Sequence, residues 1–191
     1  ATGSDDRKRT ALWYLILSNR YQGKLTEALA RTKQYRVQSE VVSPRGPSTA
    51  RNAAPTEAMP NAQVLFEMGR YREAAALFDS ISRWQVPRHM PSVIGRSRAW
   101  AMTHAATALA AGGDTVGLAA RADSVREFGA QSFYGRDQRL HHHVRGLLLL
   151  ARGDDNAAVT ELRRAIYSIN FGYTRTNIAM AEALMRQRKW A

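Results

Sequence analysis

Apolar residues recur along the chain at the spacing of one helical face. Leu12, Leu15 and Ile16 lie three and four positions apart, so a helix over residues 9–20 carries them as a single stripe. No run of alternating apolar and polar residues is long enough to predict a strand. The pattern therefore predicts an all-α fold. Further helices are expected over residues 71–83, 99–111, 137–152, 160–168 and 176–187.

A short turn motif separates these helical segments. In it, a glycine precedes a polar residue, a large residue and then Glu-Ala or Ala-Ala. Glycine can end a helix in the left-handed conformation, and the polar residue helps to start the next helix. The motif is centred on Gly23, Gly69, Gly113 and Gly153, with a degenerate copy at residues 188–191, and successive copies are 46, 44, 40 and 35 residues apart. We therefore expect about nine helices in antiparallel pairs.

Segments rich in proline and glycine lengthen three of these intervals. They cover residues 43–60, 85–95 and 128–136, and such residues stop helices and form loops. The sequence therefore predicts a first helical hairpin over residues 1–42, a proline-rich linker over 43–60 and a helical repeat array over 61–191. The last repeat is incomplete, so we expect either a longer natural protein or a partner that covers its apolar end.

Two of the units carry small and large residues at matching positions around the turn. In one unit these are Gly146, Gly153, Ala158, Leu162 and Ala165, and in the other they are Ala62, Gly69, Tyr71, Ala74 and Phe78. In this pattern the chain resembles the tetratricopeptide repeat family, whose helix-pair repeats are about 34 residues long. The resemblance implies a right-handed solenoid of antiparallel helix pairs with a concave groove. Residues 112–115, 122–125 and 172–175 are also similar to repeat segments of large multidomain bacterial regulators.

The resemblance implies a protein that binds another protein and does no chemistry of its own. It would be a scaffold or accessory subunit that uses the groove or the exposed end helix, or a repeat segment of a larger signalling regulator. The end helix would offer Ile178, Leu184 and Met185 as its apolar face. The resemblance also implies which residues face the groove. These are Gln63, Phe66, Trp100, Thr103, His104, Thr107, His143, Arg175 and Glu182. Met185 is expected to be a further partner contact.

The charge changes this picture only in the kind of partner. The 191 residues include 28 Lys and Arg against 16 Asp and Glu, a formal net charge of +12. Of the 28 basic residues 24 are arginine, and they are dispersed in the way of solvated helix faces. We expect a partner protein with an acidic surface, for example a subunit of a membrane-associated complex. The alternative is a polyanion binder acting on nucleic acid or an anionic membrane, with Trp84, Trp100 and Trp190 beside arginines as stacking platforms.

Catalytic and metal-binding patterns are missing from the sequence. The chain has no cysteine, which removes thiol chemistry and thiolate metal sites. The consecutive histidines His141, His142 and His143 point about 100° apart on a helix, so they favour helix-start or interhelix packing over a shared metal. Phosphate-binding loops and nucleophile elbows are also missing. We expect no catalytic residue, cofactor or metal, no transmembrane segment, and the cytoplasm in preference to the periplasm.

Overall fold

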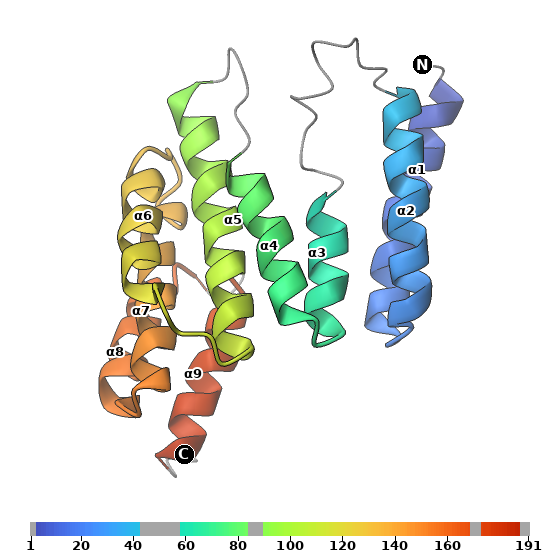
Figure 1. Ribbon diagram of the computed structural model, residues 1–191. Helices are drawn as coiled ribbons and strands as arrows, with labels where there is room; N and C mark the ends of the chain where they lie inside the picture. The colour runs from blue at the N-terminus through green and yellow to red at the C-terminus, as the bar shows by residue number, and fades with distance from the viewer. Residues whose placement is uncertain (1–2, 43–57, 84–89, 169–172, 188–191) are drawn as a thin grey trace. The chain divides into compact units, whose positions relative to one another are not determined.

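The computed structural model describes residues 3–42, 58–83, 90–168 and 173–187. Within these ranges it holds nine α-helices, one short 3₁₀ helix and no strand, which confirms the all-α prediction (Figure 1). The elements are α1 (Gly3–Tyr21), α2 (Leu25–Val42), α3 (Ala58–Glu67), α4 (Tyr71–Ser82), α5 (Pro91–Ala111), α6 (Leu118–Ala130), η2 (Asp137–Arg139), α7 (Leu140–Ala151), α8 (Asp155–Ala165) and α9 (Arg175–Arg186). They fall into two compact units, unit 1 over Ala1–Pro87 and unit 2 over Arg88–Ala191.

Unit 1 consists of two helix pairs, α1 with α2 and α3 with α4, and α2 also packs on α3. Ile16, Ala28 and Val64 are fully buried in the core that α1, α2 and α3 share. The first pair lies within residues 1–42, where the sequence predicts a hairpin. Helix α3 begins at Ala58, three residues before the predicted start of the array at residue 61. Pro60 is tolerated there because the N–H groups of the first helical turn need no partner within the helix. The rest of that linker, residues 43–57, lies outside the described residues.

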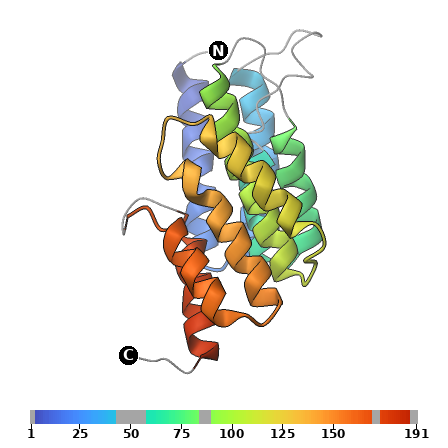
Figure 2. The same cartoon turned by 90° about the vertical axis from the view of Figure 1, so that its left-hand side faces the viewer.

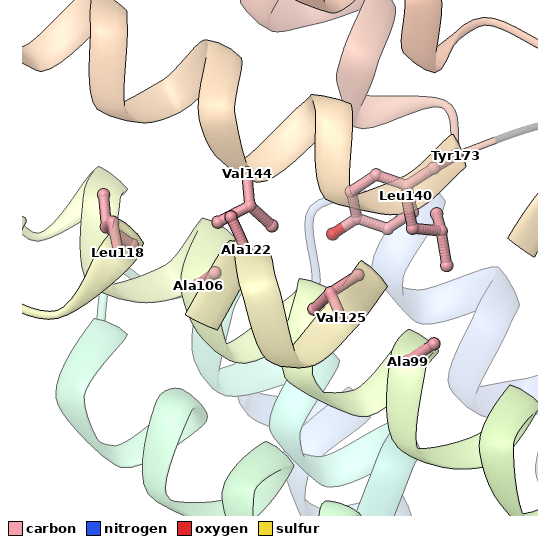
Figure 3. Close-up of a cluster of buried hydrophobic side chains, with 8 residues drawn as sticks. All are labelled: Ala99, Ala106, Leu118, Ala122, Val125, Leu140, Val144 and Tyr173. Atoms are coloured by element: carbon pink, nitrogen blue, oxygen red, sulfur yellow. The ribbon is translucent and has the colours of Figure 1, made fainter. Parts of the chain in front are cut away.

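Unit 2 stacks five helices in chain order, from green α5 to red α9 (Figures 1 and 2). Each helix packs on the next, and α5 also contacts α7, as α7 contacts α9. Alternate helices therefore touch, α5 with α7 and α7 with α9, while α6 and α8 pack on their neighbours in the chain. This is the order expected of stacked helix pairs. The main core, shown in Figure 3, is made by Ala99, Ala106, Leu118, Ala122, Val125, Leu140, Val144 and Tyr173.

The four predicted turn glycines close their helices in the same way. Gly23, Gly69, Gly113 and Gly153 all have positive φ, between 72° and 77°, a conformation that other residues rarely adopt. At the last of them, Gly153 N–H donates to Leu150 O at 3.1 Å and Asp154 N–H donates to Leu149 O at 3.0 Å. This pair of bonds is the Schellman motif, and the other three glycines repeat it. The turn motif was therefore predicted correctly at all four places.

Several helix boundaries differ from the prediction. Helix α5 begins at Pro91, eight residues before the predicted start, because proline fits the first position of a helix. Helix α8 runs over Asp155–Ala165 and so starts five residues early, since Asp154 caps it by accepting from Ala157 N–H at 3.1 Å. The prolines at residues 87 and 91 were expected to lie together in a loop. The second of them instead opens a helix.

Candidate functional site

Four of the predicted groove residues meet at one place in unit 2. Trp100, His104 and Thr107 lie on successive turns of α5, and His143 faces them from α7. Tyr173, which precedes α9, lies among them with its ring centroid 4.9 Å from that of His104 and 4.8 Å from that of His143. Its ring is also 5.8 Å from that of Trp100. The site is therefore the contact between α5, α7 and the start of α9.

These side chains pack into the interior. His143 is 0% exposed, and Thr107 and Tyr173 are each 7% exposed. Trp100 and His104 are half-buried. Thr103, also predicted for the groove, is fully buried and donates its hydroxyl to Ala99 O at 2.7 Å. Four of the residues that the resemblance implies for a groove thus lie together, and most of their side chains face one another inside unit 2.

A continuous set of hydrogen bonds joins four of these residues to Thr176 on α9. We call this set the histidine–tyrosine network, and its members are His104, Thr107, His143, Tyr173 and Thr176. The hydroxyl of Thr107 is its centre. It donates to Thr103 O at 2.8 Å, and it lies 3.0 Å from His143 Nε2 and 3.1 Å from the Tyr173 hydroxyl. Because a hydroxyl has one hydrogen and two lone pairs, Thr107 accepts from both of these groups.

That assignment fixes the rest of the network. His143 carries its proton on Nε2, so its Nδ1 accepts from the Thr176 hydroxyl at 3.1 Å. Tyr173 donates to Thr107, so it accepts from His104 Nδ1 at 3.1 Å. Each of these hydrogens has one acceptor, and His143 is neutral in this arrangement because one ring nitrogen donates and the other accepts. The network is complete without any added ligand.

Burial keeps the network in its neutral form. Loss of solvent, together with the charges of His104 and Arg175, lowers the pKa of His143 from 6.5 to about 3. Burial also raises the pKa of Tyr173 from 10.0 to about 12. Both pKa values lie far from neutral pH, on the side at which each group is uncharged.

The three consecutive histidines have three separate roles. His141 Nδ1 lies 2.9 Å from Gln138 O at the start of α7, and burial lowers its pKa to about 4. His142 Nδ1 lies 2.8 Å from Glu161 Oε2 on α8. His143 belongs to the network. The first two contacts are the helix-start and interhelix packing that the sequence favoured for these histidines. A search of the described ranges for groups of three or more His, Cys, Asp or Glu side chains that could hold a metal ion finds none.

A buried carboxylate lies beside the network and anchors the loop between α6 and α7. Asp137 is 0% exposed and accepts from Trp100 Nε1 at 2.7 Å and from the Ser132 hydroxyl at 2.6 Å. The guanidinium groups of Arg96 and Arg136 lie 3.6 and 3.5 Å from its oxygens. The loop is therefore held to α5 by hydrogen bonds and ion pairs together.

That loop presents aromatic rings and arginines to solvent. Phe133 is 82% exposed and Tyr134 is 52% exposed. We use the name aromatic–arginine surface for Phe133, Tyr134, Tyr167, Arg96, Arg136 and Arg139. Sequence reasoning did not select these six residues for binding. The sequence does contain a signal for this surface. Phe133 and Tyr134 are adjacent aromatic residues in a segment predicted to be a loop, where no helix packs them into the core, so their exposure could be expected.

The remaining predicted residues lie elsewhere. In unit 1, Gln63 accepts from Arg20 Nη1 at 2.8 Å, and the ring of Phe66 lies 5.3 Å from that of Tyr71. Arg175 is the first residue of α9 and is partly buried. Glu182 on α9 is exposed and pairs with Arg186, and Met185 is 57% exposed. Trp84 and Trp190, the other proposed stacking residues, lie outside the described residues, as do 188–191.

Searches against family models, curated proteins and solved structures give no match to this chain. Among the described helices, none is both long and apolar enough to cross a lipid bilayer.

Proposed function

We propose that this chain is a non-catalytic protein-interaction module, a tetratricopeptide-like solenoid of helix pairs, which binds a partner protein through the free face of α9. One observation carries the proposal. Ile178 is 66% exposed and Met185 is 57% exposed, and seven residues apart they share one face of α9. The opposite face is buried through Thr176, Ala179 and Ala183.

The position of this face favours a protein partner. In a stacked helical repeat, the apolar faces of the helices are normally covered by neighbouring helices. An amphipathic helix from a partner would cover Ile178 and Met185 in the same way. The alternative binding surface is the predicted groove formed by α5 and α7. The polar atoms of its residues Thr107 and His143 are already used in the histidine–tyrosine network, so we favour α9 over the groove.

The test is site-specific photo-crosslinking in the cells that produce the natural protein. A benzophenone amino acid replaces Ile178, Met185 or, as control, Val116, which is 85% exposed in the same unit. We expect one shared crosslinked protein at positions 178 and 185 and none at 116. Crosslinking that is equal at all three positions, or missing from 178 and 185, would contradict the proposal.

A matched pair of variants makes the test quantitative. Ile178→Asp is expected to weaken capture of the crosslinked protein at least about tenfold, because it places a charge in an apolar contact, whereas Val116→Asp should change it less than about twofold. Circular dichroism and thermal unfolding verify that both variants remain folded. Equal capture by the two variants would show that α9 is not the binding face.

A further inference from the structure

The aromatic–arginine surface is built from two loops of unit 2. A Cβ atom on Gly135, between α6 and α7, would lie 3.1 Å from Tyr167 Cε2, so this loop passes directly against the segment after α8. Arg139 Nη1 also donates to Ile166 O at 3.1 Å. The surface therefore joins parts of the chain that are some 30 residues apart, and the contacts of Asp137 hold one side of it in place.

The surface exposes three large aromatic side chains to solvent. Phe133 is 82% exposed, and Tyr134 and Tyr167 are 52% and 50% exposed. Single exposed apolar residues are common, but three aromatic rings on adjoining loops form a patch of the kind that marks interaction sites. Aromatic residues and arginine are also the residue types enriched where proteins bind one another.

The charge that this surface presents is positive. Arg96 and Arg136 place their guanidinium groups 4.4 and 5.4 Å from the centroid of the Tyr134 ring, and Arg139 lies 5.5 Å from that of Tyr167. Asp137 pairs with two of these arginines, but its carboxylate is fully buried and cannot face a partner. A partner therefore meets guanidinium N–H donors set among aromatic rings, on a chain with a net charge of +12.

We infer that the aromatic–arginine surface is a second docking site, for an acidic segment of a partner protein that also carries apolar side chains. Carboxylates of that segment would accept from Arg96, Arg136 and Arg139, since guanidinium groups match carboxylates in shape and charge. Its apolar residues would cover Phe133. The inference rests on the proposed function in that the chain binds proteins, but it uses a surface separate from Ile178 and Met185 on α9.

The arrangement of the rings favours a protein segment over single-stranded nucleic acid. A base stacks on an aromatic face, and the rings of Tyr134 and Tyr167 already have guanidinium groups near their centroids. A base that stacked on a ring face covered by a guanidinium group would have to displace that group and lose its cation–π contact. Carboxylates can approach the same guanidinium groups without moving them.

The experiment is selection of peptides from a phage-displayed library of random 12-residue sequences against the full chain. We expect the selected peptides to be enriched in Asp and Glu together with Phe, Trp or Leu. Synthetic copies should bind Phe133→Ala and Arg139→Glu at least about fivefold more weakly than the unaltered chain. The matched controls Val116→Ala and Arg163→Glu, exposed in the same unit, should bind within about twofold.

Each other outcome would overturn the inference. Neutral or basic peptides, or peptides whose binding is unchanged by Phe133→Ala and Arg139→Glu, would show that this surface does not select acidic segments. Equal weakening by Arg163→Glu would show a general charge effect, and tighter binding of a single-stranded oligonucleotide than of the peptides would assign the surface to nucleic acid. Peptides sensitive only to Ile178→Asp would overturn this inference and leave the proposed function in place. Failure of the crosslinking at α9 would affect only the proposed function.

Discussion

The histidine–tyrosine network and the aromatic–arginine surface both include residues of α5, and they differ in what their polar atoms meet. In the network, the Thr107 hydroxyl accepts two hydrogen bonds and donates one, and His143 uses both ring nitrogens. On the surface, guanidinium groups lie beside half-exposed rings, and only part of their hydrogen-bonding capacity is used within the chain. Aromatic and basic residues thus serve structure where their donors are paired, and remain open to a partner where they are not.

Asp137 joins the two regions, and its removal should have the largest effect. Asp137→Ala leaves Trp100 Nε1 without its acceptor and the guanidinium groups of Arg96 and Arg136 without their buried countercharge. We expect a loss of about 3–5 kcal/mol in the free energy of unfolding, measured by urea denaturation. Asp123→Ala, which removes an exposed carboxylate in the same unit, should cost less than about 1 kcal/mol. Similar losses in both variants would contradict the role of Asp137 as the anchor.

A substitution at Thr107 tests the histidine–tyrosine network without changing the aromatic–arginine surface. Thr107→Val keeps the shape but removes the acceptor that His143 Nε2 and the Tyr173 hydroxyl share, and a buried donor without a partner is costly. We expect a loss of about 2–3 kcal/mol in urea denaturation. The matched control is Thr160→Val on α8, an exposed threonine whose hydroxyl likewise bonds the carbonyl four residues earlier. The control should lose less than about 0.5 kcal/mol; a loss equal to that of Thr107→Val would mean that the network adds nothing.

The pH dependence of stability gives a smaller effect for each pH unit. In the unfolded chain His143 takes up a proton below its ordinary pKa of 6.5, whereas burial lowers its pKa in the fold to about 3. Its contribution is therefore complete above pH 6.5 and is lost as the pH falls from there toward 3, by about 1.4 kcal/mol per pH unit. Urea denaturation at several pH values between 7.5 and 4.5 measures this slope.

The control for the pH measurement is His143→Gln, which cannot be protonated. The fall in stability below pH 6.5 should be less steep in this variant. Burial also lowers the pKa of His141, to about 4, but that residue is present in both proteins and its effect cancels in the difference. Identical slopes for the two proteins would contradict a neutral, buried His143.

The fold could be predicted from the sequence where local physics decides it. The apolar spacing gave the helical class, and Gly23, Gly69, Gly113 and Gly153 marked turns because a positive φ at a helix end depends on the glycine itself. The start of α5 could not be placed in the same way. Pro91 is compatible with both a loop and a first helical turn, and the sequence alone does not choose between them.

The site was harder to predict because it depends on contacts between distant residues. Trp100, His104, Thr107 and His143 were expected to line a groove, and in the structure they lie around Tyr173, a residue that the sequence did not single out. The exposure of Phe133 likewise depends on the loop that Asp137 holds against α5. No local pattern around Tyr173 shows that its hydroxyl reaches α5.

The position of Tyr173 has a consequence for the order of folding. Its hydrogen bonds to Thr107 and His104 span 66 and 69 residues, whereas the four glycine turns close over a few residues each. Closing a longer loop costs more chain entropy, so contacts of this kind form after local ones. The helix pairs of unit 2 can therefore assemble first, and the insertion of one tyrosine side chain between α5 and α7 completes their association.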